Sequence, residues 1–253
     1  MLKLKYQTAA RIAASLITGL SLIGATQPAV PKLAGMPAEL ETRFALSAVP
    51  PALRADASVY LLNPKTGYRL ARRGNSGISC LVQRTAWELN DLRDDIYYPL
   101  CFDQEGSQTY LKVILDSASL RANGLTAAAL TALVKSRYAD KTYRPAAKPG
   151  LSYMVGPVMR TISPDRTVQT MTMPHLMFYA PGLTNEDVGA KPNPSDFSTL
   201  MNPFVDTQGN AEQSFLIQMI GATEKAKILA DEKSLVDDLC AFRHILCLTN
   251  TGH

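Results

Sequence analysis

The first 25 residues constrain the rest of the chain most, because they predict the compartment in which it folds. Three basic residues lie within the first eleven positions, residues 12–23 form an almost unbroken apolar run, and Gly24 and Ala25 precede polar residues. This order is typical of a secretory signal peptide. We therefore expect residues 1–25 to be removed and the remaining chain to be periplasmic or secreted, where thiols oxidise.

The net charge gives no reason to expect a nucleic-acid partner. The full chain carries a formal charge of +4, and the leader holds three basic residues and no acidic one, which leaves +1 for the rest. A chain with a net charge near zero is not attracted electrostatically to nucleic acids or anionic membranes. No later segment approaches the ~18 apolar residues of a membrane span, so we expect no stable span after the leader is removed.

The four cysteines predict disulfides rather than a zinc site, because the chain is expected to be exported and contains no CxxC motif. Their order favours Cys80 with Cys101 and Cys240 with Cys247, one of three possible connectivities. The second pair meets a geometric objection. An unbroken helix over residues 231–248 would separate these cysteines by ~10 Å along its axis, and a disulfide allows at most ~7 Å between Cα atoms. Either the helix breaks near residues 242–244, or these two cysteines do not pair with each other.

The pattern of apolar residues predicts a single α+β domain over residues 45–253, preceded by an extension over 26–44. Its sheet should be mainly antiparallel and accompanied by a helical hairpin and a C-terminal helix. Expected helices cover residues 37–46, 111–122, 127–137 and a segment opening at Thr223. Expected strands cover residues 58–62, 68–72, 78–82, 152–162, 167–173, 175–180 and 214–220, the first three as a meander.

Residues 181–212 form a long irregular stretch between the last expected strands. They contain four prolines and several Asn, Asp and Gly residues. Long connections without regular structure are often functional. We expect either a surface loop or part of a binding cleft here.

Several ordered blocks of sequence resemble a family of exported bacterial proteins of uncharacterised function. The blocks are ALSA (45–48) through VYLL (59–62), GISCLV (77–82) around Cys80, CFDQEG (101–106) from Cys101, PGLSYM (149–154) and PHLMFYAP (174–181). The resemblance implies an exported location and a shared fold, and it implies no activity. The tail that contains Cys240 and Cys247 lies outside these blocks.

A cluster of methionines around His175 is the most chemically suggestive pattern. Met171, Met173, His175 and Met177 alternate, which places them on one face of an extended strand. Thioether and imidazole groups suit Cu(I), so Met173, His175 and Met177 form a candidate copper site. The alternative is that these methionines fill an irregular core.

His175 is also the candidate general base of an enzyme. It is the histidine within the family-like region, and Asp103 and Glu105 are candidate acidic partners. No nucleophile elbow, metalloprotease or nucleotide-binding motif accompanies it. The alternative is a structural histidine whose ring is satisfied by a hydrogen bond.

No motif commits the chain to a reaction, so whether it is an enzyme stays open. The sequence favours a non-catalytic binding or structural role in the cell envelope, without a cofactor. The partner would be a protein or a small-molecule ligand. A hydrolase built on His175 and a copper-binding protein are the alternatives. The binding role predicts an exposed apolar patch or cleft near residues 181–212.

Overall fold

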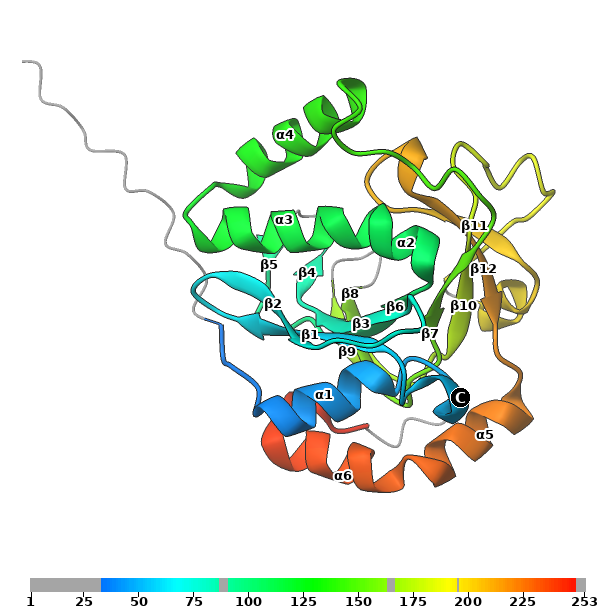
Figure 1. Ribbon diagram of the computed structural model, residues 1–253. Coiled ribbons are helices and arrows are strands. Elements are labelled where there is room, and N and C mark those ends of the chain that lie inside the picture. Colours follow the sequence, from blue (N-terminus) through cyan, green and yellow to red (C-terminus); the bar gives the residue numbers. More distant parts are fainter. Residues whose placement is uncertain (1–32, 87–90, 163–166, 195, 249–253) are drawn as a thin grey trace, which may run out of the picture.

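The computed structural model describes residues 33–86, 91–162, 167–194 and 196–248. The expected leader and residues 26–32 lie outside these ranges. The described part is an α+β fold with a large, mostly antiparallel sheet, as the sequence predicts, and helices cover both faces of this sheet (Figure 1). Within the described ranges, no helix has both the length and the apolar character needed to cross a bilayer.

The helices and short 3-10 turns follow one another in this order: α1 (Ala38–Leu46), η1 (Pro51–Leu53), α2 (Gln104–Gln108), α3 (Tyr110–Ala122), α4 (Ala127–Ala139), η2 (Phe197–Met201), η3 (Ala211–Gln213), α5 (Ala222–Asp231), α6 (Lys233–Phe242) and η4 (His244–Leu246). The predicted helical hairpin is α3 and α4. Thr126 begins α4 as its N-cap, because its hydroxyl accepts a hydrogen bond from the Ala129 amide at 3.2 Å.

The strands are β1 (Ser58–Asn63), β2 (Gly67–Arg72), β3 (Ser79–Gln83), β4 (Thr85–Ala86), β5 (Asp91–Leu92), β6 (Tyr98–Phe102), β7 (Leu151–Met154), β8 (Met159–Ile162), β9 (Val168–Met171), β10 (His175–Tyr179), β11 (Phe204–Thr207) and β12 (Ser214–Met219). Eight of them form the main sheet in the order β11-β12-β10-β7-β6-β3-β1-β2. The pairs β4-β5 and β8-β9 form two small separate sheets.

The predicted meander over the first three strands is wrong in its topology. Strands β1 and β2 form the expected hairpin, but β3 pairs with β1, and in parallel. The cause is the segment after β2, which folds over the start of β1 instead of turning back along β2. The amides of Asn75 and Ser76 both donate to the Asp56 carbonyl. Gly74 permits this crossing, because a Cβ there would lie 2.0 Å from the Asp56 oxygen.

The expected strand over residues 152–162 is two strands in different sheets. β7 stays in the main sheet between β6 and β10, and β8 leaves it to pair with β9. The chain changes direction at Gly156-Pro157, where a proline cannot donate to a ladder. The expected turn of this second hairpin, residues 163–166, lies outside the described residues.

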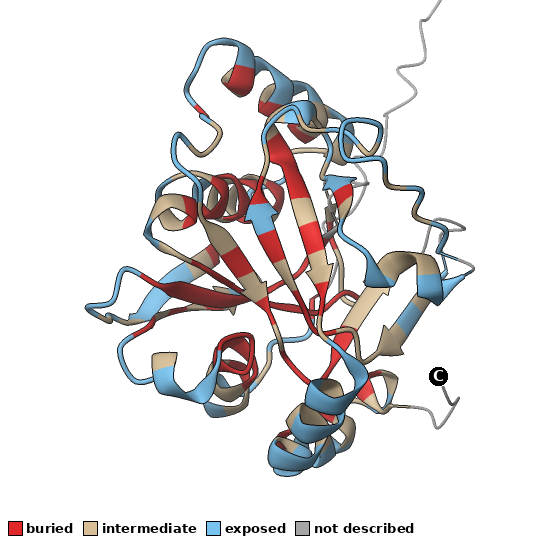
Figure 2. Ribbon diagram, turned by 90° about the vertical axis from the view of Figure 1, so that its right-hand side faces the viewer, coloured by how far each residue is buried: buried red, intermediate tan, exposed pale blue. Residues whose placement is uncertain are grey.

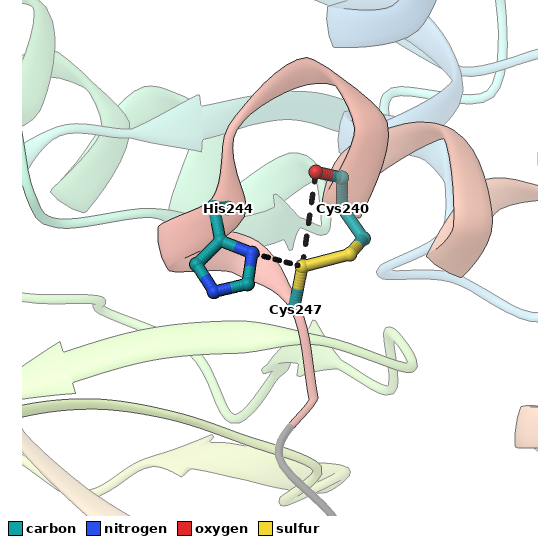
Figure 3. A group of neighbouring side chains, drawn as sticks. All are labelled: Cys240, His244 and Cys247. Carbon is teal, nitrogen blue, oxygen red and sulfur yellow. Dashed lines mark hydrogen bonds between the residues drawn. A yellow bond between two sulfur atoms is a disulfide. The ribbon is translucent and has the colours of Figure 1, made fainter.

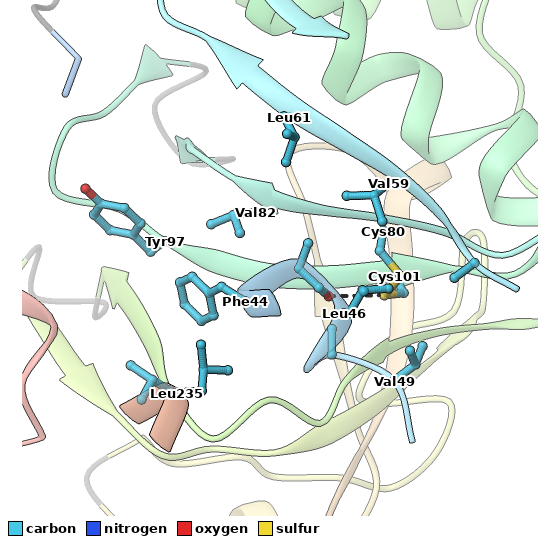
Figure 4. Close-up of a cluster of buried hydrophobic side chains, with 14 of the residues drawn as sticks. Phe44, Leu46, Val49, Val59, Leu61, Cys80, Val82, Tyr97, Cys101 and Leu235 are labelled. Carbon is cyan, nitrogen blue, oxygen red and sulfur yellow. Dashed lines mark hydrogen bonds between the residues drawn. A yellow bond between two sulfur atoms is a disulfide. The ribbon is translucent and has the colours of Figure 1, made fainter. Parts of the chain in front are cut away.

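The two faces of the main sheet bury separate hydrophobic cores. Strand β3 is buried on both sides. Cys80 and Val82 face the core under α1 and α6, and Leu81 faces the core under α2 and α3. Figure 4 shows the first core, which contains the disulfide together with Phe44 of α1 and Leu235 of α6.

Residues assigned to the N-terminal extension belong in part to this core. Helix α1 begins at Ala38, and its Phe44 is fully buried. Glu41 on the same helix is also buried, and its Oε1 accepts a hydrogen bond from the Leu62 amide of β1 at 2.8 Å. α1 is therefore packed against the sheet, and the domain starts before residue 45.

The C-terminal helix is broken twice, and the second break settles the cysteine pairing. α5 and α6 are separated at Glu232, whose carboxylate pairs with Arg54 at 2.6 Å. α6 ends at Phe242, because Arg243 adopts an extended conformation. The chain then turns back, which lets Cys240 and Cys247 form a disulfide with 4.3 Å between their Cα atoms. The other disulfide joins Cys80 and Cys101, as the sequence order predicts.

Candidate functional site

The structure places His175 in the interior, at the first position of β10. Its side chain is only 4% exposed, and it lies opposite Met154 and Met219 on the two neighbouring strands. Its Nδ1 lies 2.7 Å from the carbonyl oxygen of Met173, so this nitrogen carries the proton and donates. Burial lowers the pKa of the imidazole, because the protonated form loses its hydration.

The two acidic partners proposed for His175 are held at other places by backbone amides. Asp103 caps helix α2: its Oδ1 accepts from the Gly106 amide at 2.9 Å, and its Oδ2 accepts from the Leu151 amide at 2.9 Å. Glu105 accepts from the Ala147 amide at 2.6 Å. Both carboxylates therefore have structural roles.

The distance along β10 separates His175 from Asp103. The Tyr179 hydroxyl at the far end of β10 donates to Asp103 at 2.8 Å. His175 and Tyr179 are four residues apart on this strand, a separation of roughly 13 Å. The structure therefore does not bring His175 within hydrogen-bonding reach of Asp103, and the proposed acid–base pair is not assembled.

The methionines around His175 lie in a hydrophobic core. Met177 shares the buried face of β10 with His175, whereas Met171 belongs to β9 in a separate sheet and Met173 lies between the two strands. The same core contains further methionines, namely Met154, Met159 and Met219. This arrangement agrees with methionines as adaptable packing. The copper site of Met173, His175 and Met177 stays a prediction.

Exposed apolar side chains gather in the irregular stretch and beside it. Among the described residues, the large hydrophobic side chains that are exposed are Leu70, Phe178, Val188, Phe197 and Met201. Phe178 belongs to β10, and Val188, Phe197 and Met201 lie between β10 and β11. Helix α5 is mostly exposed and has no fully buried residue (Figure 2).

A hollow of about 540 Å³ opens beside one of these side chains, Val188. We call it the β12 hollow; it is lined by residues 188–191, Thr199, Asn202, Pro203 and Leu216. Leu216 supplies the floor, because β12 turns Phe215 and Ile217 into the core and leaves Leu216 on the other face. Pro203 and Asn202 come from the connection between η2 and β11.

Polar contacts fix the loop that forms the wall of the β12 hollow. The side-chain amide of Asn185 donates to the Val205 carbonyl at 2.9 Å and accepts from the Val205 amide at 2.7 Å. Asp187 accepts from both the amide and the hydroxyl of Thr184, and these hydrogen bonds lower the pKa of its carboxyl group. The hollow therefore has a defined wall.

The side chains that line the β12 hollow include one positive charge. Lys191 is the one ionisable side chain among the described residues that line it. Close by, the Lys225 ammonium group of α5 lies 5.9 Å from the centre of the exposed Phe197 ring. The hollow can therefore accept an apolar group and attract an acidic one at its rim.

Sequence reasoning predicted a loop or cleft over residues 181–212 from its prolines and polar residues. It did not predict Leu216, because the uncovered face of a strand depends on what packs against the sheet. No protein-family model, curated protein or solved structure matches this chain. The resemblance to exported bacterial proteins stays a prediction.

Proposed function

We propose that this protein is a non-catalytic binding protein of the cell envelope, and that the β12 hollow receives an apolar ligand with an acidic group. The observation that carries this proposal is the hollow itself, whose lining combines the exposed Val188 with Pro203 and Leu216. Its volume of about 540 Å³ lies within the range of small-ligand sites.

The two disulfides support the proposed location. Both cysteine pairs are oxidised, which is typical of proteins that fold outside the cytosol. The basic and apolar order of residues 1–25 agrees with export. The periplasm or the medium is therefore the proposed compartment.

A fluorescent probe tests the site. Anilinonaphthalene sulfonate combines an apolar ring system with one negative charge, and we expect the protein to bind it with one dominant site. Val188→Glu places a negative charge in the wall of the β12 hollow and should weaken binding by about tenfold or more. Leu70→Glu is the matched control, because Leu70 is 37% exposed and Val188 40% exposed. Equal loss in the two variants, or no loss in Val188→Glu, would contradict the proposed site.

A pair of ligands tests the acidic group. Decanoate and decanol have the same chain length and differ in charge, and each can be measured by displacement of the probe. Lys191→Ala should weaken decanoate severalfold and leave decanol unchanged, because the removed ammonium group interacts with the carboxylate alone. A parallel loss for both ligands would show that Lys191 acts through packing, which would reject the acidic ligand.

A further inference from the structure

Three side chains with metal-binding atoms meet at the C-terminal end of α6. Cys240 lies in the last turn of this helix, His244 begins η4, and Cys247 follows η4. Figure 3 shows the His244 ring turned toward the sulfur atoms. The His244 Nδ1 lies 3.4 Å from the Cys247 Sγ, and the ligand atoms of all three residues lie within 4.8 Å of one another.

The chain around this group is anchored by contacts that do not involve the disulfide. Leu239 and Leu246 are fully buried in the core beneath α1 and flank the cysteines. Arg243 donates to the Tyr97 hydroxyl at 2.8 Å and to the Asp94 carbonyl at 2.7 Å. Because these anchors do not depend on the disulfide, we expect them to keep Cys240, His244 and Cys247 close together when the bond between the sulfur atoms is opened.

The separation between the His244 nitrogen and the Cys247 sulfur fits a zinc ion. Zn–S bonds of about 2.3 Å and Zn–N bonds of about 2.0 Å at tetrahedral angles place sulfur and nitrogen about 3.5 Å apart. The His244 nitrogen and the Cys247 sulfur already have this separation. His244 is exposed and both cysteines are half-buried, so solvent can reach the group and supply a fourth ligand.

We propose that Cys240, His244 and Cys247 bind one Zn²⁺ ion when a dithiol reductant opens their disulfide. The reductant supplies two electrons and two protons, becomes a disulfide itself, and leaves two thiols on this chain. Zn²⁺ then replaces the two thiol protons, which pass to solvent, and takes the lone pair of the neutral His244 ring. The oxidised form binds no zinc, because its sulfur atoms are bonded to each other.

Reduction of the folded protein should be selective for the disulfide of Cys240 with Cys247, because the other disulfide is buried. Cys80 and Cys101 are both 0% exposed, so a reductant cannot reach them in the folded protein. Reduction without denaturant should therefore release two thiols, those of Cys240 and Cys247. Alkylation followed by mass spectrometry counts them, and a count of four would contradict the selectivity.

Zinc titration of the whole protein tests the proposal. The protein is reduced with a phosphine, freed of metal, and titrated with Zn²⁺ against a chromophoric chelator in the absence of oxygen. We expect one equivalent to bind the reduced protein and none to bind the oxidised protein. Co²⁺ in place of Zn²⁺ should give the absorption bands of a tetrahedral thiolate complex, a signature that a purely structural role would not produce.

Three variants assign the ligands. Cys240→Ser with Cys247→Ser keeps the buried disulfide and should lose zinc binding. His244→Ala should weaken it by at least about tenfold, because one of three protein ligands is removed. Asp238→Asn removes an exposed carboxylate from the same helix and should leave it unchanged. Absence of zinc binding by the reduced protein, or full binding by the double serine variant, would overturn the proposal.

Discussion

The two disulfides of this protein differ in their exposure to solvent, although each joins one cysteine to the next cysteine along the chain. Cys80–Cys101 links neighbouring strands β3 and β6, and both residues are fully buried. Cys240–Cys247 closes the end of α6 at the surface, next to an exposed histidine. In the chain-entropy model, their sequence separations of 21 and 7 residues correspond to about 3.3 and 2.4 kcal/mol.

This difference shows that the formation of a disulfide does not by itself define the role of its two cysteines. The buried disulfide lies in the core and reinforces strands that already pair. The surface disulfide reinforces a helix end that Leu239, Leu246 and Arg243 already anchor, which leaves its sulfur atoms available for chemistry. Helix α1 contacts both neighbourhoods, because it packs on β3 and on α6.

The largest effect is expected from the buried pair. Cys80→Ala with Cys101→Ala should lower the free energy of unfolding by about 4 kcal/mol, because the variant loses the cross-link and leaves a space in the core. Urea denaturation followed by circular dichroism measures this loss. A loss smaller than that of the double serine variant at positions 240 and 247 would reverse the comparison.

The next effect concerns α1, the element shared by both neighbourhoods. Burial raises the pKa of Glu41 from 4.5 to about 7, although the hydrogen bond from Leu62 and the charge of Arg84 oppose this rise. The folded protein therefore keeps a proton that the unfolded chain releases, so stability should fall as the pH rises from about 4.5 to about 7. The fall is at most roughly 3 kcal/mol.

Glu41→Gln should flatten this pH dependence, because glutamine can still accept from the Leu62 amide without titrating. The free energy of unfolding, measured by urea denaturation at several pH values, should then change less between pH 5 and pH 8 than in the wild type. An unchanged slope in the variant would show that another group causes it.

The surface disulfide should matter less for stability. Cys240→Ser with Cys247→Ser is expected to cost roughly 2 kcal/mol, because the closed loop is short. Thermal unfolding compared with the wild type under identical conditions measures this cost. A loss as large as that of the buried pair would mean that the end of α6 depends on its cross-link and not on its apolar anchors.

The smallest effect is expected for the ion pair that joins α1 to α6. Arg43 and Asp238 lie 2.7 Å apart, but both side chains are exposed to solvent. Asp238→Asn should therefore change the free energy of unfolding by less than about 1 kcal/mol. A larger change would show that charge, rather than the contacts of Leu235 and Leu239, holds these helices together.

Local signals in the sequence were sufficient for much of this fold. Thr126 predicted the start of α4, and cysteine order predicted the disulfide of Cys80 with Cys101. The pairing of Cys240 with Cys247 stayed open in the sequence, because it required a break in the C-terminal helix. The parallel pairing of β1 with β3 was not predictable in this way, because it depends on the contact of Gly74 with Asp56, which lie far apart in the sequence. A sequence pattern predicts the structure of one segment, whereas the order of strands in a sheet depends on contacts between different segments.

The candidate sites show the same limit. His175 and Asp103 were paired by residue type, and the distance along β10 separates them. The spacing of Cys240, His244 and Cys247 is visible in the sequence, but it predicts a cluster only once α6 is known to end at Phe242. The β12 hollow depends on the face of β12 left uncovered, which no single segment encodes.

The side chain of Asn185 covers part of one edge of the main sheet. Its amide occupies the outward hydrogen-bonding groups of Val205 on the edge strand β11, in the manner of a neighbouring strand. The opposite edge, β2, carries the exposed Arg69. A strand from another molecule would therefore meet an occupied backbone at Val205 on one edge and a positive charge at Arg69 on the other, two features that oppose edge-to-edge aggregation.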